Sequence, residues 1–98
     1  MNPQPTKVNV AHTADYKESY ANSVQVRVNL WDFVLMFGTI QQSVPDEVNI
    51  TNFQGIYLSP QQAKALANLL NQNLQQYEAA FGVIQLEPLK PGAGGPIH

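Results

Sequence analysis

The sequence predicts an α+β fold in which an antiparallel sheet of three or four strands precedes one long C-terminal helix that packs on it. Two observations lead to this expectation. Alternating apolar and polar residues, typical of strands, dominate residues 23–58. Helical periodicity then extends from Ser59 to a glycine at position 82. A short sheet followed by a single helix is the simplest architecture that accommodates both patterns.

The chain divides into three parts by composition. Residues 1–18 contain two prolines and mostly polar side chains, so we expect an extended N-terminal arm. Within it, Val8, Val10 and Tyr16 leave a short edge strand open as an alternative. A single α+β domain is expected over residues 19–86. Residues 87–98 are rich in proline and glycine and are expected to form a flexible tail.

The first two strands differ in how many of their faces are apolar. Residues 23–30 alternate strictly, which predicts one buried and one solvated face. Residues 32–41 form the second strand and carry apolar side chains on both faces, Phe33, Leu35 and Phe37 on one and Val34, Met36 and Ile40 on the other. Residues 29–32 lack the Asn-Gly or Asp-Gly pair of a tight hairpin, so we expect a looser connection there.

The third strand is expected over residues 48–58, after a loop at residues 43–47 that contains a proline and two acids. Its alternation is imperfect, because polar residues interrupt the apolar set near Gly55. A glycine inside a strand often marks a bulge or a close backbone approach. We therefore expect the strand to bend near residues 52–55.

Both ends of the helix carry recognisable signals. Ser59 is suited to the N-cap, Pro60 to the first helical position, and Gln62 to a capping box with Ser59. Gly82 can adopt the left-handed conformation that closes many helices after Phe81. These signals predict a helix over residues 60–81.

The helix carries one apolar stripe, formed by Leu66, Leu70, Leu74, Tyr77 and Phe81 and flanked by Ala63, Ala67, Leu69 and Ala80. This stripe is expected to pack on the sheet. One helix on one sheet barely offsets the conformational entropy of the ordered chain. Because the second strand also has two apolar faces, we expect an oligomer, most simply a two-fold homodimer.

Composition excludes several classes of partner. The 98 residues fit one domain, with 12% charged residues and a net charge of −2. The five basic residues are scattered, so no nucleic-acid partner is expected. No apolar stretch approaches the length of a membrane span, and the N-terminus lacks the apolar segment of a secretory signal. We expect a soluble, cytoplasmic protein without a membrane partner.

The sequence offers no catalytic, cofactor-binding or metal-binding residues. Cysteine is absent, and His12 and His98 have no carboxylates around them at ligand spacing. Asp32 and the pair Asp46 and Glu47 fall in expected turns, where acids are common for conformational reasons. There is no activated-serine motif and no phosphate-binding glycine loop. We therefore expect a non-enzymatic protein without cofactors.

The candidate interface or peptide-binding residues are Trp31, Phe33, Val34, Met36, Phe37, Ile40 and Asn73. Trp31, Phe33, Met36 and Phe37 form the densest apolar cluster. It is interpreted as core plus subunit interface, or as a groove for an extended polypeptide. Asn73 is a polar residue inside the helical stripe. It is expected to hydrogen-bond a neighbouring backbone group or its counterpart across an interface, with contact to a ligand as the alternative.

Several sequence blocks resemble the DUF3467 family of small uncharacterised bacterial proteins. They are Tyr20-Ala21-Asn22, then Trp31-Asp32-Phe33-Val34-Leu35-Met36-Phe37-Gly38, then Leu58 to Leu66 followed by Asn73, Tyr77, Glu78, Phe81 and Gly82. The resemblance covers about residues 19–84. Met36 departs from the family pattern, which has a polar or acidic residue at this position. The methionine makes this face of the strand more apolar. The resemblance implies a strand-rich N-terminal half and a C-terminal helix, with no established activity.

A second likeness, to the SecB-type export chaperones, is architectural only. Those proteins also look like an antiparallel sheet followed by a long helix, form oligomers and bind unfolded chains. Two hypotheses follow. The leading one is a non-enzymatic oligomeric structural or protein-interaction module whose partner is a second copy of itself. The alternative is a chaperone-like binder of extended polypeptide, with another protein or peptide as partner.

Overall fold

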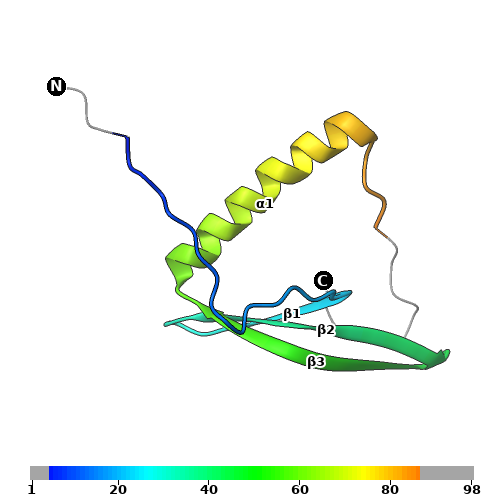
Figure 1. Ribbon diagram of the computed structural model, residues 1–98. Coiled ribbons are helices and arrows are strands. Elements are labelled where there is room, and N and C mark those ends of the chain that lie inside the picture. Colours follow the sequence, from blue (N-terminus) through cyan, green and yellow to red (C-terminus); the bar gives the residue numbers. More distant parts are fainter. Residues whose placement is uncertain (1–4, 87–98) are drawn as a thin grey trace.

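The computed structural model describes residues 5–86, which contain three strands and one helix (Figure 1). These are β1 (Ser23–Val28), β2 (Phe33–Val44), β3 (Glu47–Leu58) and α1 (Pro60–Phe81). The strands form one antiparallel sheet in the order β1-β2-β3. The expected α+β arrangement is confirmed. The expected flexible tail at residues 87–98 lies outside the described residues.

The pairing of β2 with β3 shifts by one residue in the middle of the strands. Phe37 lies opposite Gln54, whereas the next residue, Gly38, lies opposite Asn52, so Phe53 is the extra residue of a β-bulge. Gly38 is buried, and a Cβ atom there would collide with the carbonyl oxygen of Thr51 and with Asn52. The bend expected near residues 52–55 is therefore confirmed, and its close backbone approach lies at Gly38 on the facing strand.

The connection between β1 and β2 is tight, so the expectation of a looser connection was wrong. The backbone N–H of Asn29 donates to the carbonyl of Asp32 at 3.0 Å. The Asn29 Oδ1 accepts from the N–H groups of Trp31 at 2.8 Å and Asp32 at 2.9 Å. An asparagine that bonds the backbone two residues on stabilises a turn without an Asn-Gly pair. That local side-chain bond explains the difference.

The connection between β2 and β3 is also shorter than the loop expected at residues 43–47. β2 continues to Val44, which pairs with Glu47, so only Pro45 and Asp46 form the turn. Proline fits the second position of a turn because its φ is fixed there. Both hairpins are therefore compact, and they hold the three strands in a defined register.

The register assigns the strand side chains to two faces. Face A carries Val24, Val26, Val28, Phe33, Leu35, Phe37, Ile56 and Leu58. Face B carries Arg27, Val34, Met36, Ile40, Ile50 and Tyr57. Each triplet of neighbouring residues across the strands, such as Val26, Leu35 and Ile56, lies on one face because side chains alternate along a strand.

The ends of α1 are those expected from the sequence. The Oγ of Ser59 accepts a hydrogen bond from the N–H of Gln62 at 3.1 Å, and Pro60 occupies the first helical position. At the other end, the N–H of Gly82 donates to the carbonyl of Glu78 at 2.9 Å, and Gly82 has a φ of 103° and a ψ of 164°, a positive-φ conformation that differs from the left-handed helical one expected. A positive φ is readily adopted by glycine, so the glycine ends the helix at Phe81.

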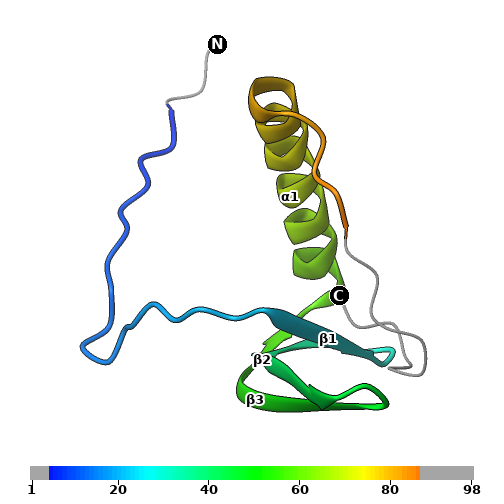
Figure 2. The same cartoon turned by 90° about the vertical axis from the view of Figure 1, so that its right-hand side faces the viewer.

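The position of α1 relative to the sheet differs from the expected close packing. Figure 1 shows α1 beginning at the end of β3 and leaving the sheet at an angle, and Figure 2 shows the same separation from the side. No residue of α1 is buried. The helix covers face A near its first turns only, and a wedge opens between its far end and the sheet.

The arm is extended and contains no strand between residues 5 and 22. Figure 2 shows it running from the start of β1 beside the sheet and then away from it. Near its middle, the N–H of Tyr16 donates to the carbonyl of Thr13 at 3.1 Å and forms a turn. The alternative of an edge strand at Val8 and Val10 is therefore not realised, and both side chains are exposed.

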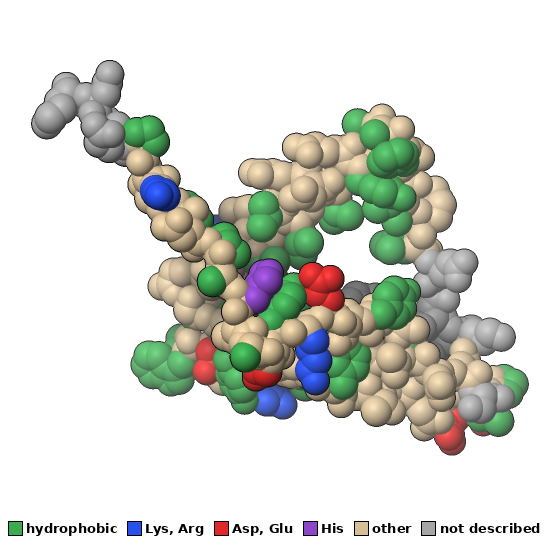
Figure 3. Space-filling view, viewed as in Figure 1, with side chains coloured by type: hydrophobic (Ala, Val, Ile, Leu, Met, Phe, Trp, Pro, Cys, Tyr) green, Lys and Arg blue, Asp and Glu red, His purple; other side chains and the backbone are tan. Residues whose placement is uncertain are grey.

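Among the described residues, Val34 is the one buried hydrophobic residue, at 4% exposure. In the same part of the chain Ser23 is the one buried polar residue, and Gly38 is also buried. Large apolar side chains are exposed on β1, β3 and α1, and Figure 3 shows them gathered along the helix and over the sheet. A single chain in this arrangement has almost no hydrophobic core.

Candidate functional site

The most distinctive surface of the molecule is the wedge between α1 and face A. It contains a cavity of about 520 Å³. Its walls are Val26, Phe33, Leu35 and Leu58 from the sheet and Pro60, Ala63, Lys64, Leu66, Ala67 and Leu70 from the helix. Lys64 is the only charged residue of this lining. A cavity with this composition suits apolar side chains.

The apolar stripe of α1 continues beyond the wedge and stays open to solvent. Leu74 is 45% exposed, Tyr77 51% and Phe81 75%. Residues 82–86 turn back from the end of the helix, and Ile84 lies beside Leu74 and Tyr77. The N–H of Ile84 donates to the Glu78 carboxylate at 2.9 Å, which holds this returning segment in place. The segment narrows the exposed stripe but leaves most of it uncovered.

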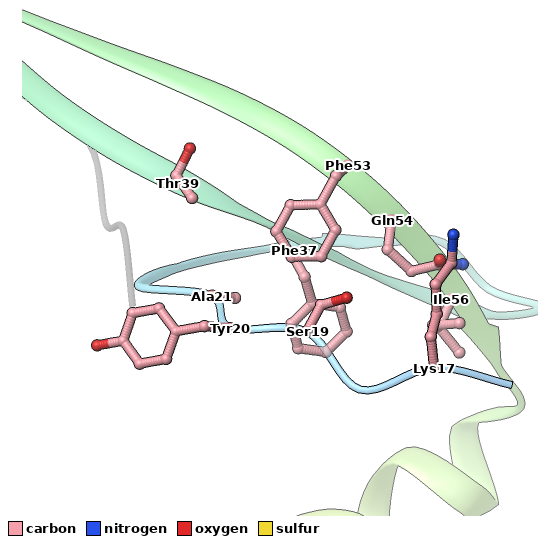
Figure 4. Close-up of a pocket in the computed structure, with 9 residues that line it drawn as sticks. All are labelled: Lys17, Ser19, Tyr20, Ala21, Phe37, Thr39, Phe53, Gln54 and Ile56. Carbon is pink, nitrogen blue, oxygen red and sulfur yellow. The ribbon is translucent and has the colours of Figure 1, made fainter.

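A second groove, of about 620 Å³, lies on face A where the arm crosses the sheet (Figure 4). Its lining consists of Lys17, Ser19, Tyr20 and Ala21 from the arm and Phe37, Thr39, Phe53, Gln54 and Ile56 from β2 and β3. In Figure 4 the arm passes Phe37 while the ring of Tyr20 points away from it. Face A therefore lies against an extended segment of its own chain at one end and against the start of α1 at the other.

Face B is partly covered by its own polar side chains. Val34 lies between Arg27 and Tyr57 in the register, and the Arg27 guanidinium donates to the Tyr57 hydroxyl at 3.5 Å. Further along, the side-chain amide of Asn52 donates to the Gln25 side-chain Oε1 at 3.2 Å across β2. These long side chains reach over the central strand, which explains why Val34 is buried. Face A has no comparable cover over the wedge.

The candidate residues from the sequence do not form one surface. Phe33 and Phe37 lie on face A, the first in the wedge and the second at the arm. Val34, Met36 and Ile40 lie on face B. Trp31 lies at the tip of the first hairpin and is 78% exposed. The sequence reasoning missed the wedge residues Val26, Leu35 and Leu58, which the strand register brings together.

Asn73 lies on α1 beside the cavity formed by Leu70, Leu74, Tyr77 and Ile84. Its side-chain amide donates to the carbonyl of Leu69 at 2.8 Å, within its own helix. This bond satisfies one amide hydrogen and leaves the Asn73 Oδ1 as an acceptor. The residue is exposed in the single chain.

The titratable residues of the arm make contacts with each other. The ring of His12 stacks on that of Tyr16, with centroids 4.1 Å apart. The Tyr16 hydroxyl donates to Glu18 at 2.8 Å, and this hydrogen bond raises the pKa of Tyr16. Within the described residues, no three histidine, aspartate or glutamate side chains lie close enough together to hold a metal ion. The same part of the chain contains no helix long and apolar enough to cross a membrane.

Comparison with known proteins gives one match. The sequence model of a family described as protein of unknown function (DUF3467) matches residues 1–86. No curated protein and no solved structure matches the chain. The match extends through the arm, the sheet, the helix and the returning segment, which are all the elements that form the wedge and the groove.

Proposed function

The chain belongs to the DUF3467 family, whose function is unknown, and from this premise we propose that it is a non-enzymatic interaction module that works as a homodimer or a larger assembly. One observation carries the proposal. Val34 is the single buried hydrophobic residue among those described, whereas the apolar faces of the sheet and helix lie open. Contiguous apolar surface of this kind marks a protein interface in soluble proteins.

The exposed area supports the same proposal. The chain exposes 8851 Å². A compact monomer of 10.8 kDa exposes about 5,500 Å². The extended arm contributes part of the excess of about 3,300 Å², but a stable dimer requires only about 800 Å² from each partner. An excess of this size is compatible with a stable interface between copies.

A second copy is a suitable partner because every copy carries the same two uncovered surfaces. A two-fold dimer buries each surface twice, which doubles the benefit of every apolar contact. The chain also has few charges, and its net charge of −2 gives little repulsion between copies. The proposal retains the expected cytoplasmic location.

Sedimentation velocity over a range of concentrations tests the proposal. We expect a dimer or larger species at micromolar concentration. Leu70→Glu places a charge in the wedge and should shift the protein towards monomer, whereas Asn68→Glu, on the opposite side of α1, should not. Circular dichroism shows whether each variant keeps its fold. A folded wild-type protein that sediments as a monomer at every concentration would refute the proposal.

A second candidate function is the binding of extended polypeptide. It is favoured by the arm groove, in which residues 17–21 of the chain itself lie along Phe37 in an extended conformation. A fluorescently labelled unfolded peptide tests it by titration. Saturable binding that is lost in Phe37→Ala combined with Phe53→Ala, two residues of this groove, would support this function. The absence of saturable binding, or binding that survives both substitutions, would reject it.

A further inference from the structure

The apolar stripe of α1 contains a seam with the spacing of a coiled coil. Its residues recur at alternating intervals of four and three, which keeps them on one line facing a partner helix. They are Ala63, Ala67, Leu70, Leu74, Tyr77 and Phe81. Directly beside this seam, Lys64, Asn71 and Glu78 form a flanking row with one residue every seven positions. The seam and the flanking row together have the pattern of one helix in a coiled-coil pair.

The side chains of the seam increase in size along the helix. Its first two members are alanines, its middle members are leucines, and its last two are aromatic. If a second copy of α1 runs antiparallel, Phe81 meets Ala63, Tyr77 meets Ala67, and Leu74 meets Leu70. Every layer then pairs a large residue with a small one, or two leucines. A parallel pair would place alanine against alanine at one end and leave a void there.

The charges of the flanking row also favour the antiparallel orientation of the two helices. Lys64 and Glu78 are the only charged residues of α1. In the antiparallel pair, Lys64 of one copy lies beside Glu78 of the other, and Asn71 lies beside its own counterpart. In a parallel pair, identical charges would lie at the same height along the axis. Opposite charges across a helix pair favour the orientation that brings them together.

The wedge supplies a place for the aromatic end of the second helix. Ala63 and Ala67 are the small residues of its helical wall, and the cavity of about 520 Å³ lies between them and Phe33 on face A. The antiparallel register brings Tyr77 and Phe81 of the second copy to these two alanines. The rings of Tyr77 and Phe81 already lie together, with centroids 5.0 Å apart.

We infer that α1 of a second copy enters the wedge antiparallel to α1 of the first, so that its Tyr77 and Phe81 fill the cavity between the helix and face A. The exchange is mutual, because the two-fold axis passes near Asn71. This inference rests on the proposed self-association and adds the orientation and the register of the two helices.

Site-specific crosslinking tests the inference, because the chain contains no cysteine. Asn71→Cys places a thiol next to the predicted two-fold axis. Gln72→Cys is the matched control, since it is also polar and exposed but points away from the seam. A short bismaleimide crosslinker should convert Asn71→Cys to a species of twice the monomer mass and leave Gln72→Cys at the monomer mass. Equal crosslinking of both variants would overturn the inference.

A second pair of variants tests the direction of the helices. A mixture of Lys64→Cys and Glu78→Cys should crosslink mainly between the two variants, whereas each variant alone should crosslink poorly. Efficient crosslinking of each variant with itself would indicate parallel helices and overturn the inference. If the wild type sediments as a dimer but Asn71→Cys does not crosslink, this inference fails while the proposed function stands. If the wild type sediments as a monomer, both fail.

Discussion

The aromatic rings of Tyr77 and Phe81 lie one helical turn apart on α1, with their centroids separated by 5.0 Å and their planes inclined by 50°. This tilted arrangement is favourable for aromatic pairs. Both rings are more than half exposed to solvent. Because the pair has its shape before any partner is present, less side-chain freedom is lost when it is buried. The pair is therefore the strongest anchor that α1 offers.

Removing both rings should weaken self-association. Burial of one large side chain contributes about 1.5–3 kcal/mol, so Tyr77→Ala with Phe81→Ala should raise the dissociation constant by about a hundredfold or more. Sedimentation equilibrium measures this change. Gln72→Ala with Gln76→Ala changes the opposite side of the helix and should leave the constant unaltered. An unchanged constant in the aromatic variant would show that α1 does not form the interface.

Exchanging the two charges of α1 provides an independent prediction. Lys64→Glu alone, or Glu78→Lys alone, should raise the dissociation constant several-fold, since each exposed ion pair contributes about 0.2–1 kcal/mol. The double variant should recover the wild-type value. High salt should reduce the differences between all four proteins. If the double variant is as weak as the two single variants combined, Lys64 and Glu78 do not meet across the interface.

The ends of the helix and the bulge were predictable because their causes are local. Ser59, Pro60 and Gly82 act on backbone groups within four residues of themselves, so a short stretch of sequence contains the whole signal. Gly55 gave the approximate place of the bulge. The turn at residues 29–32 was placed correctly, but its tightness was not predicted, because the side-chain hydrogen bonds of Asn29 replace the more familiar Asn-Gly pair.

The angle between α1 and the sheet was not predictable, because it depends on contacts between elements that are distant in sequence. The apolar stripe of α1 predicted that the helix packs against another apolar surface, but it did not identify that surface. Most of the candidate interface residues were also chosen because they lie close together in the sequence. Alternation along β2 separates Phe33 and Phe37 from Met36, whereas the hairpin register places Phe33 opposite Val28 and Leu58. Strand register is set by the geometry of the turns, and the sequence indicated the place of both turns but not their tight geometry.

Gly38 should tolerate no side chain. A Cβ atom there would lie 2.5 Å from the Asn52 Oδ1 and 2.8 Å from the Asn52 Cα, and would also collide with the Thr51 carbonyl oxygen. The backbone of the bulge must shift to admit it, so Gly38→Ala should lower the free energy of unfolding by about 1–3 kcal/mol. Urea denaturation measures the loss.

Gly55 supplies the matched control for Gly38. It lies in the neighbouring strand on the same sheet, and a Cβ atom there would meet only the Val34 Cγ2, at the ordinary distance of 3.8 Å. Gly55→Ala should therefore change the free energy of unfolding much less than Gly38→Ala. Equal losses in the two variants would mean that the bulge does not have the geometry described.

Ser59→Ala should destabilise the start of α1. The substitution removes the oxygen that accepts from the N–H of Gln62 at 3.1 Å, and loss of an N-cap costs about 1 kcal/mol. Ser59→Asp retains an acceptor and places a negative charge at the helix N-terminus, so it should keep or raise stability. Thermal unfolding followed by far-ultraviolet circular dichroism, at one protein concentration for all variants, measures both effects. If the melting curve of Ser59→Ala matches the wild type, the helix begins elsewhere, and the angle at which α1 leaves β3 is not set at this residue.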